Sequence, residues 1–377
     1  MKKVLTIYIS AGEVSGDLHG AELVKALQTL SPLPIRFCGT GGDAMRAAGV
    51  DLFHHVDELA TMGIWEVIKR IGFFKRLLRE TIERVRGLKP DLFISIDYPG
   101  FNLRLAEGIR TSGIKAVHYI SPKVWVWKAN RIPKIAAAYD LLLCIFPFEP
   151  RLFSKTGLRA IYVGNPLVAE VRQTLEKPWR PLPWRGAPRI GLLPGSRLEE
   201  VHRLMPIMLK AVERIRQRFP TASFLIPTPT ERVRRAVCRF ALPDSITVIS
   251  GQSLEVMRQA DAAVIASGTA TLESVLVGCP TVLIYRVAKL TEWFARCVIH
   301  SIRHVGLANI IAEREVIPEL LQEQCNPQAV ANQVCRLLTD TTVKQAMLND
   351  FSEVRDALGK GDASAAAARS IIDLMRL

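Results

Sequence analysis

The chain of 377 residues lacks several features that would place it in a familiar class of protein. It has no run of about 18 apolar residues, so we expect no membrane-spanning helix. Its seven cysteines are scattered without a CxxC pair, which is typical of reduced cysteines in a cytoplasmic protein and argues against a metal site. It also has neither zinc-finger spacing nor an aromatic RNA-binding signature. We therefore expect no metal, no cofactor and no nucleic acid partner.

Basic side chains, in contrast, are abundant. The chain has 50 Lys and Arg against 36 Asp and Glu, for a formal net charge of +14. This excess indicates anionic partners, such as a phosphorylated metabolite or an anionic membrane surface. The apolar stretch after the basic N-terminus, Val4–Ile9, is too short for a signal peptide and predicts a first strand instead.

Short apolar runs alternate with helical stretches along most of the chain, and its length indicates two domains. The pattern predicts an α/β fold with two Rossmann-like, doubly wound domains facing a central cleft. The Pro-, Trp- and Arg-rich segment 178–188 is the expected boundary, which gives domains over 1–177 and 178–355 and a last helical segment over 356–377. Strands are expected at Val4–Ser10, Ile35–Gly39, Leu92–Ile96, Ala116–Ile120, Leu141–Phe146, Ala160–Val163, Ile190–Leu193, Ser223–Ile226, Ile246–Ile249, Ala262–Ala266 and Thr281–Ile284.

Two turns of small residues in the second half are candidate anion sites. One is Leu193–Arg197, with Ser196 and Arg197 at its end, and the other reads ASGTATLE over 266–273. Free N–H groups and the positive end of a helix dipole converge at such turns, where small side chains let an anion approach. Each turn alone could equally be a well-capped connection, but together they favour a nucleotide diphosphate between them. The candidate residues of the second turn are Gly268, Thr269, Ala270 and Glu273.

Two turns of the first half carry candidate side chains for the same cleft, whereas 38–42 is a plain flexible turn. Asp97 ends a very apolar strand, where partial desolvation would make it a better general base than a surface carboxylate. The turn after the first strand, 10–20, offers four cleft candidates. For both turns the alternative is a residue that caps a helix. The four candidates are Glu13, Ser15, Asp17 and His19.

Segment 61–86 predicts a cationic amphipathic helix, with seven basic and three acidic residues. Such a helix could lie in an anionic lipid interface, or its apolar stripe could pack on the sheet while the charges are solvated. The candidate membrane-contacting residues are Ile64, Trp65, Val67, Ile68, Ile71 and Phe74. Trp125 and Trp127 follow another predicted strand among several cations, which suggests a binding wall, although two core tryptophans would look similar.

Taken in order, these motifs resemble those of the lipid-A-disaccharide synthases, which are inverting glycosyltransferases with the two-domain glycosyltransferase B fold. The shared motifs are AGEVSGDLHG, IDYPGFN, YISPKVWVWK, PFE, LLPGSR and ASGTATLES, followed by LANII at 307–311 and PELLQ at 318–322. Each motif is modest alone, but the ordered set spans nearly the whole chain and is highly specific.

The resemblance implies transfer of 2,3-diacylglucosamine from its UDP conjugate onto 2,3-diacylglucosamine 1-phosphate, giving a β-1,6 disaccharide 1-phosphate and UDP. It implies that Asp97 is the general base, that Arg197 holds the diphosphate, and that the 268–270 turn donates N–H bonds to it. The protein would be cytoplasmic and bound peripherally to the cytoplasmic face of the inner membrane through segment 61–86. The last helix would cross back to the first domain. The residues implied to line the UDP site are Asn309, Glu319 and Gln322.

Two positions depart from the family pattern. Lys123 stands where a small residue is common, and Asn165 stands where His is frequent, so we assign no catalytic role to Asn165. One alternative function is another UDP-N-acetylglucosamine-using enzyme of the same fold, either a peptidoglycan-type N-acetylglucosaminyltransferase or a UDP-sugar epimerase. A nicotinamide-dependent dehydrogenase fits less well, because the glycines at 39–42 depart from GxGxxG spacing. A non-enzymatic peripheral membrane protein would leave the two anion turns unexplained.

Overall fold

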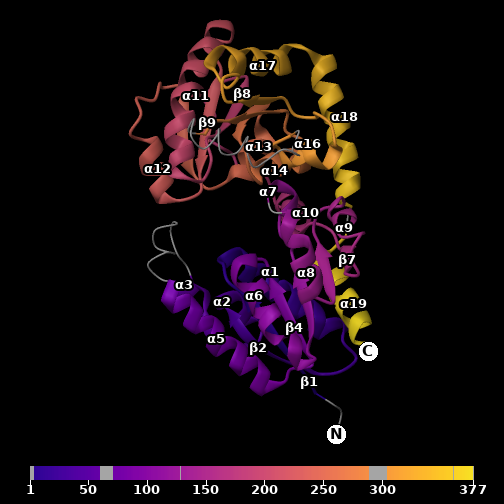
Figure 1. The fold of residues 1–377 in the computed structure, drawn as a ribbon. Helices are drawn as coiled ribbons and strands as arrows, with labels where there is room; N and C mark the ends of the chain where they lie inside the picture. Colours follow the sequence, from indigo (N-terminus) through magenta and orange to yellow (C-terminus); the bar gives the residue numbers. More distant parts are fainter. Residues whose placement is uncertain (1–3, 60–70, 128, 288–303, 360, 377) are drawn as a thin grey trace. The chain divides into compact units, whose positions relative to one another are not determined.

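The computed structural model describes residues 4–59, 71–127, 129–287, 304–359 and 361–376 (Figure 1). Contacts divide the chain into a first unit, Met1–Pro166 with Lys360–Leu377, and a second unit, Leu167–Gly359. Of the proposed membrane-contacting residues, Ile64, Trp65, Val67 and Ile68 lie outside the described residues, and so does the side chain of Ile71. The side chain of Trp127, a candidate of the binding wall, also lies outside them.

Seven parallel strands form the sheet of the first unit, in the order β3-β2-β1-β4-β5-β6-β7. The strands are β1 (Leu5–Ala11), β2 (Ile35–Gly41), β3 (Val50–His55), β4 (Leu92–Ile96), β5 (Lys115–Tyr119), β6 (Leu141–Cys144) and β7 (Arg159–Tyr162). The helices of this unit are α1 (Val14–Leu30), α2 (Asp43–Ala47), α3 (Val56–Leu59), α5 (Ile71–Leu88), α6 (Pro99–Ile109), α7 (Val124–Trp127), α8 (Ile132–Ala138), α9 (Glu149–Leu152) and α19 (Ala363–Met375), with 3-10 turns η1 (Arg110–Ser112) and η2 (Ala129–Arg131).

The central strands of this sheet are apolar on both faces because helices cover both sides, as in other parallel sheets. All five residues of β4 are buried. Ile94 and Ile96 pack with Ile9 in one core cluster, whereas Phe93 packs with Tyr8 in another, as the alternation of side chains along a strand requires. This two-sided burial explains why β4 reads as an unbroken apolar run in the sequence.

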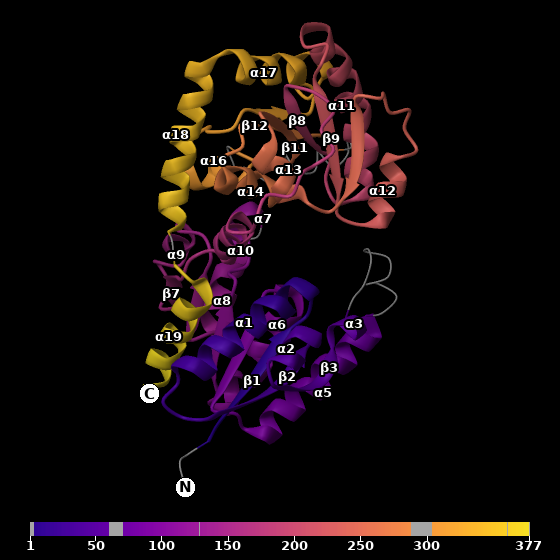
Figure 2. The same ribbon diagram turned by 180° about the vertical axis from the view of Figure 1, so that it is seen from behind.

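The closing helix α19 belongs to the first unit although it follows the whole of the second. Ala367, Ala368 and Ile371 of α19 are buried in the same core cluster as Leu23 and Leu27 of α1. The two helices pack against each other, as Figure 2 shows for the yellow α19. Helix α19, near the end of the chain, therefore completes the core of the first unit.

The second unit has six parallel strands in the order β10-β9-β8-β11-β12-β13. They are β8 (Arg189–Leu193), β9 (Ser223–Thr228), β10 (Ile246–Ser250), β11 (Ala262–Ala266), β12 (Thr281–Tyr285) and β13 (Glu319–Leu321). The helices are α10 (Pro166–Leu175), α11 (Leu198–Arg218), α12 (Glu231–Val237), α13 (Ser253–Gln259), α14 (Ala270–Val277), α16 (Leu307–Ala312), α17 (Pro327–Thr339) and α18 (Thr341–Leu358).

The α/β, doubly wound architecture is confirmed in both units, although most strand ends differ by one or two residues from the expected ones. Strands β3 and β13 were not predicted, because polar residues interrupt the first and the second has only three residues. Strand β6 ends at Cys144 rather than Phe146, because the N–H groups of the next two residues bind the Glu149 carboxylate. The expected boundary at residue 177 also differs, because α10 groups with the second unit.

Within the described ranges, no helix is both long and apolar enough to cross a membrane. The His, Cys, Asp and Glu side chains of those ranges form no group of three that could hold a metal ion.

Candidate active site

The sheet of the first unit reverses its strand order between β1 and β4, whose carboxyl ends are adjacent because Ala11 pairs with Ile96. In open α/β sheets, ligands bind outside the carboxyl ends of the strands at such a switch point. Glu13 and Asp97 lie within two residues of those strand ends. The fold thus brings together two carboxylates that the sequence named as candidates.

A buried asparagine holds the Asp97 turn in place. The Asn102 Nδ2 donates to the main-chain oxygens of Asp97 at 2.8 Å, Ile96 at 3.2 Å and Ser10 at 3.3 Å, and its Oδ1 accepts from the Ser10 hydroxyl at 2.8 Å. Asp97 and Tyr98 both have left-handed backbones, with φ of 44° and 48°. Such conformations cost about 1–3 kcal/mol each and persist only where the surroundings enforce them. Asn102 supplies that enforcement by tying the ends of β1 and β4 together.

Asp97 is half-buried, and this burial raises the pKa of its carboxyl above the ordinary value. The Tyr98 N–H, Lys123 and His19 oppose that effect by favouring the charged form. Burial also raises the pKa of Glu13, and the nearby charge of Asp97 adds to the rise. A carboxylate with a raised pKa next to cations can accept a proton from a substrate hydroxyl and then share the charge with its neighbours.

The absence of a side chain at Gly12 leaves room for the Tyr98 ring at this turn. A Cβ on Gly12 would lie 2.2 Å from the Tyr98 Cδ1, so any larger residue must displace the ring. The glycine in the turn after β1 is therefore required by packing.

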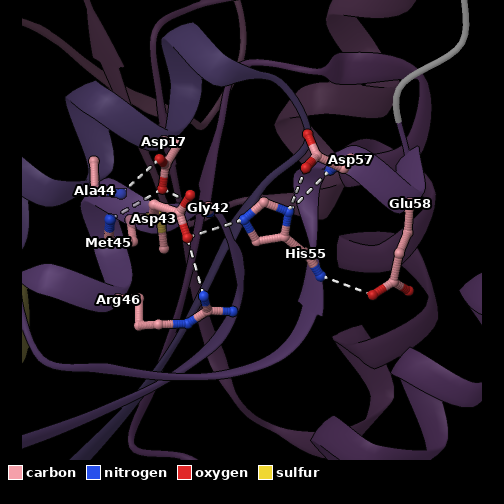
Figure 3. A network of polar contacts seen from close by, with 9 residues as sticks. All are labelled: Asp17, Gly42, Asp43, Ala44, Met45, Arg46, His55, Asp57 and Glu58. Atoms are coloured by element: carbon pink, nitrogen blue, oxygen red, sulfur yellow. Dashed lines mark hydrogen bonds and ion pairs between the residues drawn. The ribbon is translucent and has the colours of Figure 1, made fainter.

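Asp17, another candidate from the same turn, has a structural role. Figure 3 shows its carboxylate at the start of α2, where it accepts from the N–H groups of Gly42 at 2.6 Å, Ala44 at 3.0 Å and Met45 at 3.0 Å. These bonds satisfy the free N–H groups that begin every helix. Ser15 is exposed in the first turn of α1, and His19 is half-buried one turn later. Of these three, His19 is the one whose charge acts on Asp97.

The wall that follows β5 is built around Trp125. The Trp125 ring meets Phe146 and Phe148 edge-on, with centroids at 6.4 and 5.3 Å. Beside it, Glu149 is fully buried and accepts from the N–H groups of Ile145 and Phe146 through Oε2, both at 3.1 Å. Burial raises the Glu149 pKa to about 7, against the smaller opposing effects of these N–H groups, Trp125 and Lys123. Sequence reasoning missed the roles of Glu149 and Asn102, although both lie in the quoted motifs PFE and IDYPGFN.

A cavity of about 920 Å³ begins at the residue after Asp97. It lies among α5, α6 and α8, where α6 packs against both of the other helices. Its apolar lining includes one of the proposed membrane-contacting residues, Phe74, which is half-buried. An elongated apolar group could be accommodated here, directly beside the Asp97 turn. The apolar residues of this cavity are Phe74, Leu78, Tyr98, Phe101 and Leu103.

In the second unit, the two candidate anion turns lie next to each other. Strand β8 pairs with β11, with Leu193 opposite Ile265, so the turns that follow emerge from adjacent strand ends at the switch point of this sheet. The N–H groups of Gly268, Thr269 and Ala270 have no acceptor among the residues that the structure describes. Nothing lies within 4 Å of where a Gly268 Cβ would stand. The turn therefore presents open donors at the start of α14.

The turn after β8 is held by Glu200 of α11. The Arg197 N–H donates to Glu200 Oε2 at 3.4 Å, and a Cβ on Gly195, whose φ is +103°, would lie 2.3 Å from that oxygen. The Arg197 guanidinium is largely exposed, with Glu200 at 3.5 Å. The side chain can thus reach a ligand at the switch point, and Ser196 precedes it in the same turn.

Three side chains near the ends of β12 and β13 mainly form hydrogen bonds to main-chain groups: Asn309, Glu319 and Gln322. Glu319 accepts from the N–H groups of Val305 and Gly306 and from Asn309 Nδ2, at 2.8–3.1 Å. Asn309 is fully buried, and its Oδ1 accepts from the N–H groups of residues 316 and 317. Gln322 Oε1 accepts from the Val287 N–H at 2.9 Å. The three side chains fix the start of α16 and the loops around it.

Glu273 lies in the first turn of α14, apart from that group. Burial raises its pKa, and the charge of Glu170 adds to the rise. It lines a second cavity, of about 390 Å³, together with Gln252 and Ser253 at the start of α13.

Solved structures with the same fold include UDP-N-acetylglucosamine 2-epimerases and glycosyltransferases. A putative UDP-N-acetylglucosamine 2-epimerase from Listeria monocytogenes superposes with a TM-score of 0.68 at 14% identity, covering 99% of this chain and 97% of that one. CalG4, the calicheamicin glycosyltransferase, superposes with a TM-score of 0.58 at 18% identity, covering 100% of this chain and 98% of that one. At these identities the likeness establishes the fold alone.

Sequence comparison is more specific. Residues 7–370 match the family model described as Lipid-A-disaccharide synthetase. The lipid-A-disaccharide synthase of Myxococcus xanthus (strain DK1622) is 37% identical over 383 residues, covering 98% of this chain and 97% of that protein. The enzyme of the same name from Neisseria meningitidis serogroup B (strain ATCC BAA-335 / MC58) is 37% identical over 388 residues, covering 99% and 98%. Since the match extends over nearly the whole chain, this protein belongs to the lipid-A-disaccharide synthetase family and is an enzyme of lipid A disaccharide synthesis.

Proposed function

We propose that this protein transfers a 2,3-diacylglucosaminyl group from its UDP conjugate to the 6-hydroxyl of 2,3-diacylglucosamine 1-phosphate. The products are the β-1,6-linked disaccharide 1-phosphate and UDP. The observation that carries the proposal is the half-buried Asp97 carboxyl with its raised pKa, on a turn that Asn102 holds at the switch point of the first unit. The family membership supplies the substrates that the geometry alone does not name.

At the acceptor end, Asp97 removes the proton from the attacking hydroxyl. The hydroxyl oxygen forms a bond to the anomeric carbon of the donor while the bond from that carbon to the diphosphate oxygen breaks. The electron pair of the broken bond leaves with UDP, and the anomeric configuration inverts. General-base assistance of this kind contributes about 10²–10⁴-fold to the rate.

At the donor end, the N–H groups of residues 268–270 and the Arg197 guanidinium bind the diphosphate. They stabilise the negative charge that develops on the leaving group, because fixed dipoles and cations aimed at that charge need no reorganisation during the reaction. Solved structures titled as an S. aureus MnaA–UDP co-structure and a Neisseria meningitidis UDP-GlcNAc 2-epimerase bound to UDP-GlcNAc share this fold, which supports binding of a UDP-sugar. Asn309, Glu319 and Gln322 shape the nucleotide site through the loops that they hold.

The acyl chains of the acceptor enter the 920 Å³ cavity beside α5 and α6. Phe74 lies in the first turn of α5, which covers residues 71–86 of the cationic amphipathic segment 61–86. We infer that this segment contacts the anionic cytoplasmic face of the inner membrane, from which both acylated substrates come.

The direct test is incubation of the purified protein with both acylated glucosamine substrates, with product mass and UDP release measured. The proposal predicts one UDP released per disaccharide 1-phosphate formed. Epimerisation or transfer of soluble UDP-N-acetylglucosamine, with no disaccharide formed from the acylated pair, would contradict it and favour the sugar-nucleotide enzymes that share this fold.

A further inference from the structure

The cavity beside Asp97 has a basic rim as well as an apolar floor. Four cations line it, and they come from separate elements: Lys75 from α5, Arg104 from α6, Arg131 from η2 and Lys134 from α8. One acidic residue, Glu107, lines the same cavity. The chain thus concentrates positive charge around an opening whose interior suits acyl chains.

These four cations differ from other basic residues of the first unit. Arg36, Arg46, Arg110 and Arg159 each form an ion pair with an aspartate. Within the described ranges, no hydrogen bond or ion pair engages Lys75, Arg104, Arg131 or Lys134. An anion bound among these four cations would be attracted by each of them and would reduce the repulsion between them.

We propose that this rim binds the 1-phosphate of the acylated acceptor and selects the phosphorylated sugar. Two guanidinium and two ammonium groups can donate to the three terminal oxygens of a phosphate monoester, which carries about −1.5 to −2 charge at neutral pH. The proposal rests on the function proposed above, because the acceptor of that reaction carries an acylated sugar and such a phosphate on one molecule.

The position of the rim fits that acceptor. Tyr98 and Pro99, which directly follow Asp97, line the cavity, and Arg104 lies about 7.5 Å along the axis of α6 from Pro99. In the acceptor, a single sugar ring separates the 1-phosphate from the 6-hydroxyl that must reach Asp97. The donor differs, since its phosphates leave with the nucleotide and are assigned to the turns of the second unit. The rim therefore distinguishes acceptor from donor.

The test compares the phosphorylated acceptor with 2,3-diacylglucosamine lacking the phosphate, in neutral detergent micelles at saturating donor. The variants are Arg104→Gln and the pair Arg131→Gln with Lys134→Gln. Arg36→Gln is the matched control, because Arg36 is exposed on β2 and lies outside both the cavity lining and segment 61–86. For the rim variants, kcat/KM with the phosphorylated acceptor should fall about tenfold per lost arginine, whereas it should change less than about twofold with the dephosphorylated one. The control should match the wild type with both acceptors.

Equal losses with both acceptors, or no loss with either, would overturn the phosphate site. Binding of the phosphorylated acceptor is measured in parallel without donor. If the wild-type protein binds this acceptor selectively but forms no disaccharide, the proposed reaction is contradicted, whereas the proposed phosphate site at the rim is not. Binding of each variant to phosphatidylglycerol vesicles tests a second source of the phosphate, the headgroup of a membrane lipid. Variants that lose vesicle binding while keeping wild-type acceptor kinetics would show a membrane headgroup site and overturn the proposal.

Discussion

Asn102 decides where Asp97 stands. Its side chain is fully buried and makes four hydrogen bonds, three to main-chain oxygens at the ends of β1 and β4 and one to the Ser10 hydroxyl. The carboxylate could be predicted from the sequence because an aspartate ends an apolar strand. Its support could not, since nothing in the residue order says that Asn102 would turn back onto Ser10, which is 92 positions earlier.

Asn102→Ala is expected to lower the free energy of unfolding by about 2–4 kcal/mol, because it leaves buried main-chain oxygens and the Ser10 hydroxyl without a partner. Turnover per folded molecule should also fall, since the left-handed Asp97 turn loses its support. Denaturant unfolding measures the free energy of unfolding, and kcat measures turnover. The control is Asn349→Ala, because Asn349 is exposed and accepts a hydrogen bond from Gln345 on the surface. Wild-type stability in the Asn102 variant would refute this role.

Glu149 makes the stability of the protein depend on pH. Its folded-state pKa of about 7 lies above the ordinary 4.5, so between these pH values the folded protein keeps a proton that the unfolded chain has released. Stability contributed by this group is therefore present at low pH, falls as pH rises from about 4.5 to 7, and stays low above that range.

Glu149→Gln removes this titration. The stability of the variant relative to the wild type should rise by about 1–3 kcal/mol between pH 5 and pH 8. Urea unfolding at both pH values measures it, with the exposed Glu22→Gln as a control that should show no such change. A difference between variant and wild type that is constant with pH would contradict the assignment.

At the scale of elements, the two turns of the second unit lie together because β8 and β11 are neighbours. Strand β11 was predicted with its observed ends, Ala262–Ala266, since all five residues are buried and apolar. Strand β13 was missed because it has three residues and carries Glu319, which belongs to the α16 cap. Apolar runs thus predict central strands well, while short edge strands depend on contacts from distant parts of the chain.

Gly268→Ala is expected to weaken UDP binding about tenfold or more, because its methyl group would stand in the open space before the free N–H groups of the turn. Calorimetric titration with UDP gives the affinity. The control is Gly359→Ala, which also has open space around its Cβ and a positive φ, but lies at the end of α18. Both variants should lose about 1 kcal/mol of stability from backbone strain. An equal effect of the two on UDP affinity would argue against a diphosphate at residues 268–270.

At the scale of the whole molecule, the chain builds two parallel sheets, each with one switch point, and returns to the first unit with α19. This plan could be predicted from the alternation of apolar runs and from the ordered motifs. The structural roles of Asp17 and Glu319 could not, because the sequence does not show whether a carboxylate accepts hydrogen bonds from the start of a helix or from a ligand. Only their hydrogen-bond partners, the N–H groups at the starts of α2 and α16, distinguish the two.

Because α19 completes the core of the first unit, Ile371→Ala should lower its stability by about 2–5 kcal/mol. UDP affinity should stay near the wild-type value, since we assign the nucleotide to the second unit. Ile372→Ala on the same helix is the control, because this side chain is partly exposed and should cost less. Equal costs for the two variants, or loss of UDP binding in Ile371→Ala, would contradict this division.

We propose that the two units divide the reaction, with the base in the first unit and the leaving diphosphate bound to the second. The most direct measurement is kcat together with the Kd for UDP in Asp97→Asn. We expect kcat to fall by about 10²–10⁴-fold while the Kd for UDP stays within about twofold of the wild type. Retention of most turnover by this variant, or a matching loss of UDP affinity, would contradict the claim.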